Sequence, residues 1–438
     1  MPKKKELPLS RMEMLQQRLA KSEFGIQTAA DFMDTIRYLD FCDPNTGLPT
    51  ISQEWLIGSR GFIAGRLTAM KATYSKGKSS YLYLQYGAAQ RKSDAFCFHI
   101  ETEGAPSPAD RVRSLGADPK KLLQSECGSL DDCFAQIDTM ICEIRGGFGG
   151  SIGATGRVIK TRFTDPVDPD CESPILIGVD SLSELDLEKT SQQDVMDTGK
   201  VTGIGEVARA VRKFIKGRAM RLKQTQTALF ITAHETEKIQ QMPSFGGGDN
   251  KSFVAENAVA GAATFGINFA KPSNWYNKST GDLLGTILHL STFKNKWNPK
   301  PGSLDLFLTP YNGFDMIHTD ATFLLDSDNS PFKNKKFGLL NKDGELFETC
   351  RDTRGRIICT ALRDKTAGGF SSEEEFVRAF YENEDILSSC RERMRIRGFG
   401  HDWEDKYPSV EELDAATTLE SEKSKDFMPG DFNDKGDK

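Results

Sequence analysis

Hydrophobic and polar positions follow two alternating periods along most of the chain. Short apolar runs typical of buried strands are separated by longer segments in which apolar residues recur every three or four positions, as they do in helices packed on a sheet. The predicted strands span residues 65–71, 95–100, 175–179, 227–232, 284–293 and 304–309. The predicted helices span residues 79–91, 130–144 and 206–223. Strands that alternate with helices predict an α/β fold with a mostly parallel sheet covered on both faces.

The same pattern divides the chain into four predicted regions. These are a helical N-terminal appendage, an α/β core, a small C-terminal domain and an acidic tail, at residues 1–45, 46–330, 331–400 and 401–438. The appendage carries amphipathic helical patterns at 11–21 and 29–39 and ends at a turn signal at 43–47.

Two further segments stand out by composition. Residues 146–172 are rich in glycine and poor in apolar residues, which predicts an insertion without regular structure. In the C-terminal domain, a helix is expected at 373–381, because Ser372 and Glu375 have the spacing of a capping box.

The charge is concentrated at one end of the chain. The net charge is −6, and residues 402–438 alone hold 12 acidic residues and 5 lysines, so the rest of the chain is close to neutral. A tail of this kind is typical of a solvated, disordered segment, or of a regulator that competes with DNA for a basic groove.

Composition also restricts the compartment. No run of about 18 apolar residues occurs, and the N-terminus leads into a charged helix rather than an apolar signal segment, so we expect a cytoplasmic protein that does not enter a membrane. The nine cysteines are scattered and never spaced as Cys-x-x-Cys, which argues against a zinc site or a disulfide framework.

A phosphate-binding loop is the strongest chemical signal. Residues 72–79 read Ala-Thr-Tyr-Ser-Lys-Gly-Lys-Ser and lie between a predicted strand and a predicted helix. Lys78 would bring a positive charge to the β- and γ-phosphates, and Ser79 a hydroxyl to Mg²⁺, while Ala72 replaces the commoner glycine. The cofactors expected are ATP and Mg²⁺, and the expected nucleotide-binding residues are Ala72, Thr73, Tyr74, Ser75, Lys76, Gly77, Lys78, Ser79, Ser80 and Asp180.

Three polar residues at the ends of predicted strands complete this site. Asp180 ends the apolar strand 175–179 and would support the metal together with Ser79, directly or through a water. Glu103 follows another strand and is the candidate to orient the attacking water, with Glu101 as the competing choice. His234 follows strand 227–232 and could sense the γ-phosphate, although a single histidine is as often structural.

These motifs and their order resemble the RecA family of recombinases, particularly the phage members of the UvsX type, over residues 50–330. The matching segments include 64–80, 100–105, 114–123 and 179–182. The resemblance implies a RecA-like P-loop ATPase core, and it implies that the N-terminal appendage, residues 1–45, serves in oligomerisation. It places the family's catalytic glutamate on Glu103, and on His234 the residue that couples the γ-phosphate to the second DNA-binding loop.

Residues 293–296, Phe-Lys-Asn-Lys, resemble the family segment whose two lysines reach the ATP of a neighbouring subunit. The resemblance therefore gives this catalytic role to Lys294 and Lys296. Without it, two lysines at a strand end are as often a solvated pair.

The resemblance also places two DNA-binding loops, at about 187–205 and 240–265. The candidate contacts share flexibility, positive charge or an aromatic ring, and are Lys200, Gly203, Gly205, Phe245, Gly246, Gly247, Gly248, Lys251 and Phe253. A flexible surface loop is the alternative interpretation of the second segment. The basic helix 206–223 fits either a phosphate backbone or a solvated face.

The sequence thus predicts a DNA-dependent ATPase that forms a helical filament on single-stranded DNA and pairs it with double-stranded DNA. Single-strand-binding and mediator proteins are the further partners expected, in the cytoplasm of a phage-infected bacterial cell. Two alternatives stay open: a ring-forming helicase or DNA motor of the same fold, and an ATP-regulated filament scaffold.

Overall fold

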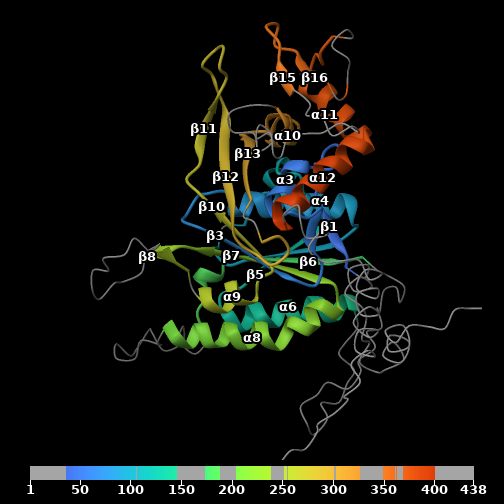
Figure 1. Ribbon diagram of the computed structural model, residues 1–438. Helices are drawn as coiled ribbons and strands as arrows, with labels where there is room; N and C mark the ends of the chain where they lie inside the picture. Colours follow the sequence, from blue (N-terminus) through green and yellow to red (C-terminus); the bar gives the residue numbers. More distant parts are fainter. Residues whose placement is uncertain are drawn as a thin grey trace, which may run out of the picture.

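A large mixed sheet forms the centre of the molecule. The computed structural model describes residues 36–104, 106–145, 173–187, 204–237, 251–253, 255–299, 302–325, 349–360, 362 and 368–399. Within these ranges the largest sheet has ten strands (Figure 1). The predicted α/β class and the mostly parallel sheet are confirmed.

One half of the sheet is parallel. Its strands follow the order β10-β3-β7-β6-β4-β5. Their bounds are β10 (Phe265–Phe269), β3 (Leu67–Ala72), β7 (Thr227–His234), β6 (Ile175–Asp180), β4 (Phe96–Glu101) and β5 (Leu122–Glu126). Because these strands run in one direction, residues that follow their carboxyl ends gather along one edge of the sheet.

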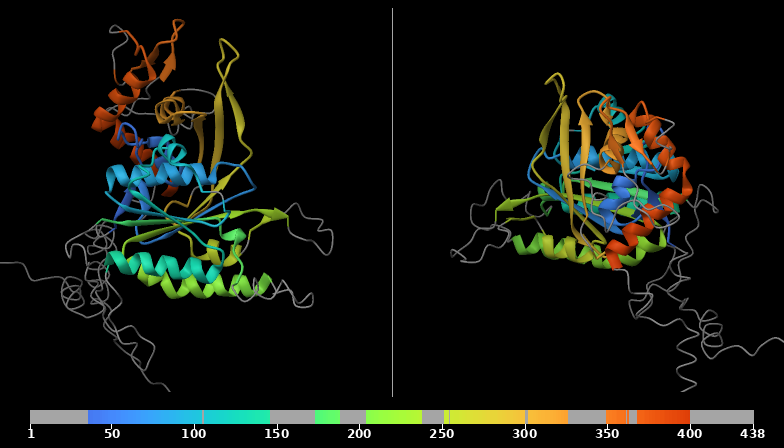
Figure 2. Two further views of the ribbon diagram at one scale, coloured as in Figure 1. Left: turned by 180° about the vertical axis from the view of Figure 1, so that it is seen from behind. Right: turned by 45° about the horizontal axis from the view of Figure 1, so that its top comes forward.

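Beyond β10 the sheet becomes antiparallel. Strand β12 (Leu283–Asn295) pairs with β10, with β13 (Ser303–Thr309) and with the short β11 (Ser273–Tyr276), and β14 (Gly313–Phe314) closes the edge. The β11–β12 hairpin extends well beyond the rest of the sheet in all three views (Figures 1 and 2).

Helices cover both faces of the parallel half (Figure 2). Helix α4 (Lys78–Lys92) lies on one face, where its tyrosines Tyr81 and Tyr86 are fully buried against strand residues such as Phe230. The other face carries α6 (Leu130–Arg145), α8 (Ile204–Gln224) and α9 (Glu256–Ala262). Helices α6 and α8 each bury one apolar stripe, whereas α4 is buried on all sides between residues 81 and 90. All three helices lie close to their predicted positions.

The N-terminal part differs from its prediction. A helical pattern was expected to continue to residue 39, but Tyr38–Asp40 form strand β1, which pairs with β2 (Gly61–Ile63). Leu39 and Phe41 are buried in the same core as α4, so packing on the core overrides the local helical period. The rest of the predicted appendage, residues 1–35, lies outside the described residues.

The C-terminal elements pack on a third apolar cluster. Helices α3 (Ile51–Ile57), α10 (Met316–Leu324), α11 (Glu373–Glu382) and α12 (Glu384–Phe399) meet there, beside the small pair β15 (Thr349–Arg351) and β16 (Ile357–Cys359). Helix α11 confirms the helix predicted at 373–381. Its cap is also confirmed, since Ser372 Oγ accepts a hydrogen bond from the Glu375 N–H at 3.1 Å.

Shorter elements complete the described chain: α5 (Ala109–Ser114), the 3-10 turn η1 (Leu182–Glu184), β8 (Thr236–Glu237) and β9 (Lys251–Ser252). No helix in the described ranges combines the length and the apolar character needed to cross a membrane. The predicted insertion 146–172 and the acidic tail 401–438 fall outside those ranges.

Candidate functional site

The loop between β3 and α4 has a tightly constrained backbone. Ser75 has φ 56° and Gly77 has φ 89°, both in the left-handed region that favours glycine. A Cβ atom at Gly77 would also lie 2.6 Å from Leu288 Cδ1 on β12. Glycine is therefore required at position 77 by both conformation and space. Ala72, at the start of the loop, is completely buried.

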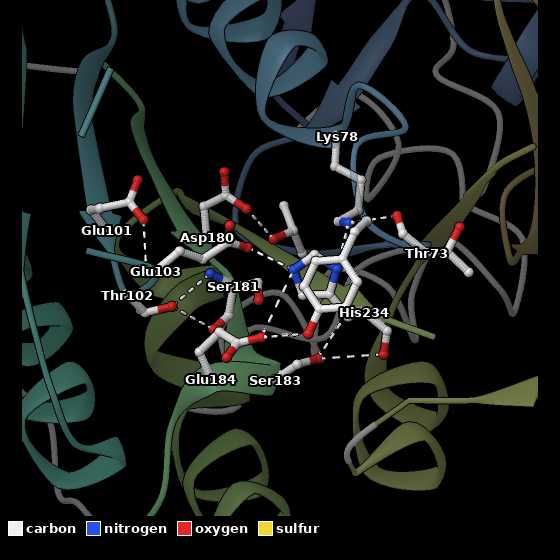
Figure 3. A network of polar contacts seen from close by, with 12 residues as sticks. Thr73, Lys78, Glu101, Thr102, Glu103, Asp180, Ser181, Ser183, Glu184 and His234 are labelled. Atoms are coloured by element: carbon white, nitrogen blue, oxygen red, sulfur yellow. Dashed lines mark hydrogen bonds and ion pairs between the residues drawn. The ribbon is translucent and has the colours of Figure 1, made fainter. Parts of the chain in front are cut away.

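Lys78 begins α4 and points across the loop toward β7 (Figure 3). Its Nζ lies 3.1 Å from His234 Nδ1 and 3.4 Å from the carbonyl oxygen of Thr73. Burial lowers the pKa of the Lys78 ammonium, while the carboxylates of Asp180 and Glu103 act in the opposite direction. The ammonium is thus desolvated and lies among carboxylates, so it can exchange its contact with His234 for one with a bound anion.

Glu103 and His234 are in close polar contact. Glu103 Oε1 lies 2.6 Å from His234 Nε2. A lysine ammonium can only donate, so His234 Nδ1 accepts from Lys78, and Nε2 carries the proton that is donated to Glu103. Lys78, His234 and Glu103 therefore form a directed hydrogen-bond chain that joins the loop to the ends of β7 and β4.

Three neighbours fix the position of His234. Its backbone N–H donates to Ser183 Oγ at 2.7 Å. The Tyr74 ring stacks on the imidazole with 3.8 Å between ring centroids, and the Tyr74 hydroxyl donates to Glu184 at 3.2 Å. Tyr74 was expected only as a loop contact, and no sequence pattern pointed to Ser183 or Glu184. Tyr74 is 60% exposed, so the stack is open to solvent on one side.

Asp180 lies deeper than these residues, at the end of β6. It is almost fully buried, and its Oδ1 accepts a hydrogen bond from Thr232 Oγ1 at 2.5 Å. The predicted partner Ser79 is half-buried in the first turn of α4. Asp180 also joins His99 and Glu101 in a group whose ligand atoms lie within 4.8 Å of one another, a further arrangement that could hold a metal ion.

Glu101 differs from Glu103 in its surroundings. Its Oε1 accepts the Glu103 N–H at 2.8 Å, and its Oε2 lies 3.4 Å from His99 Nε2. Burial raises the pKa of Glu101, but the hydrogen bonds from His99 and from the Glu103 N–H outweigh it, so the pKa is lowered. Glu101 is thus an ionised, inward-facing carboxylate, whereas Glu103 faces the loop.

Lys294, near the end of β12, and Lys296, just after it, do not lie beside these residues. Lys294 Nζ donates to the carbonyl oxygens of Ala260 and Gly261 at the end of α9, the latter at 2.9 Å, and Lys296 Nζ lies 3.3 Å from the Gly261 oxygen. Within the chain, both ammonium groups cap the C-terminal end of this helix.

The candidate DNA contacts have mixed outcomes. Lys251 lies in β9, which pairs with β8, and Gly205 lies in the first turn of α8 rather than in a flexible loop. Phe253 is a correction: it is only 5% exposed and belongs to the core beneath α8 and α9, so its ring cannot stack on a base in this conformation. The remaining candidates, Lys200, Gly203, Phe245, Gly246, Gly247 and Gly248, lie outside the described residues.

Helix α8 presents its basic residues in two ways. Arg218 and Arg221 both pair with Asp138 on α6, at 2.6 and 2.8 Å, and so hold the two helices together. The exposed basic residues of this helix are Arg209, Arg212, Lys213, Lys216 and Lys223. The first group is structural, whereas the second group is exposed on the surface of the helix.

Taken together, the site offers a glycine-dependent loop, a buried ammonium, a buried carboxylate and a glutamate–histidine pair. This set can bind a phosphorylated ligand, support a divalent cation and orient a water molecule. In comparisons with models of protein families and with curated proteins, the chain matched none of them.

Proposed function

We propose that this chain is an ATP-dependent DNA recombinase with a RecA-like core, which forms helical filaments on single-stranded DNA and promotes strand exchange. The observation that carries the proposal is the convergence of Lys78, Glu103, Asp180 and His234 at one edge of the sheet, around the loop 72–79 (Figure 3). The RecA-like interpretation is supported by the order of these residues along the chain and by the parallel strands that carry them.

The residues around the loop fit ATP with Mg²⁺. Ser79 and Asp180 offer hard oxygen donors of the kind Mg²⁺ prefers, and the backbone N–H groups at the start of α4 are positioned to bind phosphate. When bound, Mg²⁺ would neutralise charge that develops on the phosphate oxygens. The group formed by His99, Glu101 and Asp180 lies beside this place and supplies additional negative potential.

Glu103 is the proposed base and His234 the proposed sensor of the γ-phosphate. A phosphate attracts the Lys78 ammonium more strongly than the His234 imidazole does, because the phosphate oxygens carry full negative charge and the imidazole nitrogen offers only a lone pair. Binding of ATP would therefore draw Lys78 away from His234 Nδ1, and the Glu103–His234 pair would then rearrange. This leaves Glu103 free to accept a proton from the attacking water.

A rearrangement at His234 can reach the proposed DNA-binding segment through the chain that follows it. Two residues after His234 the chain enters β8, which pairs with β9. These two strands bracket residues 238–250, which contain the first part of the predicted second DNA loop, 240–265. The exposed basic residues of α8 would add contacts to the phosphate backbone.

The proposed setting is the cytoplasm of a bacterial cell, where the filament would act on single- and double-stranded DNA. Strand exchange can be measured directly with a labelled single strand, a homologous duplex and ATP. We expect joint molecules with the homologous duplex and none with a heterologous duplex. Equal products with both duplexes, or none with either, would contradict the proposal.

A ring-forming helicase or DNA motor would use the same loop, metal site and base. Electron microscopy of the protein with single-stranded DNA and a slowly hydrolysed ATP analogue separates the two architectures. A helical filament supports the recombinase, and closed rings support the motor.

A further inference from the structure

A buried ion cluster lies between the phosphate loop and the two lysines at the end of β12, Lys294 and Lys296. Lys71, the residue before the loop, is only 7% exposed, and its Nζ lies 2.9 Å from Glu235 Oε1. A second carboxylate, Glu256 Oε1, lies at 4.0 Å, and the Phe293 ring faces the ammonium at 4.9 Å. One buried cation thus touches residues from three other segments of the chain.

Each of those segments belongs to a part of the proposed site. Glu235 follows His234 directly, and its N–H donates to the carbonyl oxygen of Ala72 at 2.9 Å. Glu256 is the first residue of α9, and Phe293 precedes Lys294. Lys71 is therefore next to the loop, the sensor histidine and the lysine pair, without belonging to any of them.

Helix α9 is held at both ends by lysines. Near its N-terminus, Glu256 faces Lys71, and at its C-terminus the carbonyl oxygens of Ala260 and Gly261 accept hydrogen bonds from Lys294. Lys296 adds a weaker contact to the Gly261 oxygen. The helix is two turns long, so a shift of its first residue is transmitted to its last carbonyl groups.

We propose that Lys71 and Glu256 are positioning residues that couple nucleotide binding at the loop to release of Lys294 and Lys296 from the end of α9. The proposal rests on the recombinase function above, because only an assembled filament gives the released lysines a neighbouring nucleotide to reach. While Lys294 and Lys296 cap α9, their ammonium groups are bound to carbonyl oxygens of their own subunit.

The physical basis is competition between two carboxylates for one buried ammonium. Lys71 is paired with Glu235 at 2.9 Å, while Glu256 stands 1.1 Å farther away, at 4.0 Å. If rearrangement at His234 moves Glu235, the desolvated Lys71 needs a new partner, since an unpaired buried charge is strongly unfavourable. After Glu235, Glu256 is the nearest acidic group to Lys71 among the described residues. Helix α9 would therefore be drawn toward Lys71 and away from Lys294 and Lys296.

Glu256→Gln is the most selective test of this coupling. It removes the carboxylate of α9 but leaves the Lys71–Glu235 pair and the loop intact. Glu384→Gln is the matched control, because Glu384 is also the first residue of a helix, is exposed, and lies in α12, among the C-terminal elements. Lys71→Arg keeps the positive charge and is expected to retain the coupling.

Two readouts distinguish coupling from a purely structural effect. In steady-state ATP turnover on single-stranded DNA, Glu256→Gln is expected to lower kcat roughly tenfold while KM for ATP stays within about twofold, in the range of known coupling between sites. In hydrogen exchange, an ATP analogue is expected to speed exchange of the α9 amides in the wild type but not in Glu256→Gln, with the α6 amides unchanged in both.

The outcomes also separate this inference from the proposed function. If the wild type binds no ATP analogue, or its turnover does not respond to DNA, the proposed function fails. If the wild type binds and responds but Glu256→Gln matches it in kcat and in α9 exchange, the coupling is wrong. A parallel fall of kcat, ATP affinity and thermal stability in Glu256→Gln would likewise overturn it, because that is the pattern of general unfolding.

Discussion

Glu101 and Glu103 lie two residues apart at the end of β4 and differ in burial. That difference distinguishes two candidates for the base that the sequence alone left open. Both carboxylates were candidates for the catalytic base. The Glu101 side chain is 8% exposed and bonded to the Glu103 N–H, whereas the Glu103 side chain is 36% exposed and faces His234. Of the two, Glu103 is therefore better placed for the proposed role of base, because its carboxylate is partly exposed beside the loop.

Replacement of the proposed base, Glu103, gives the first prediction. Glu103→Gln is expected to lower kcat for ATP by about 10²–10⁴-fold, the usual contribution of a general base, because an amide cannot take up the proton. Affinity for an ATP analogue should change little, as fluorescence titration would show. Glu101→Gln should reduce kcat far less, and a larger loss in that variant would assign the base to Glu101.

Gly77 allows a test of the loop that does not touch a charged group. Gly77→Ala places a Cβ in the left-handed region, which costs about 1–2 kcal/mol, and brings it against Leu288. We expect weaker binding of an ATP analogue by isothermal titration calorimetry. The double variant with Leu288→Ala should recover part of the affinity, because the contact is then relieved. No recovery would mean that backbone strain alone accounts for the loss.

At the scale of elements, the C-terminal helices are attached to the core through buried polar groups. Asp320 on α10 accepts hydrogen bonds from Ser52 on α3 and from Tyr381 on α11, the latter at 2.7 Å. Nearby, Arg391 of α12 pairs with Glu54 at 2.7 Å. These contacts fix the relative positions of four helices that share one apolar cluster.

Asp320 should make the stability of this region depend on pH. Burial raises the pKa of its carboxyl from 3.8 to about 7, so the folded chain holds this proton more tightly than the unfolded chain. The contribution of Asp320 to the free energy of unfolding is complete below pH 4 and is lost as the pH rises to 7. Between these values the free energy of unfolding falls by about 1.4 kcal/mol per pH unit. Asp320→Asn should abolish this slope in urea unfolding measured from pH 4 to 8, and an unchanged slope would contradict the assignment.

Helices and strands with a strong hydrophobic pattern could be predicted from the sequence. Strands that form mainly because a neighbouring strand offers a pairing edge could not. Helices α6 and α8 bury a regular stripe, and the parallel strands β3, β4, β6 and β7 coincide with predicted apolar runs. The parallel strands β5 and β10 were not predicted, and β5 has only one buried residue in five. Strand β11 has the sequence Ser-Asn-Trp-Tyr, which shows no clear alternation. It exists because β12 offers a pairing edge and because Trp275 packs on Phe307 and His318.

At the scale of the whole molecule, the predicted site residues came together because parallel strands end at one edge. Asp180 and His234 are the last residues of their strands, and Glu103 follows β4, so these three residues meet because the parallel strands are neighbours in the sheet. By contrast, the Tyr74 stack and the Lys71 cluster depend on loop conformation and strand register, which local pattern does not encode. Phe253 was assigned to DNA for the same reason, since its burial follows from the packing of α9.

The central claim is that the site of Lys78, Glu103, Asp180 and His234 hydrolyses ATP under the control of DNA. Steady-state ATP turnover, measured with and without single-stranded DNA, tests it most directly, with Lys78→Ala as the control. The account predicts turnover that rises severalfold or more with DNA and is lost in Lys78→Ala. Wild-type turnover that does not respond to single-stranded DNA, yet remains sensitive to Lys78→Ala, would contradict it.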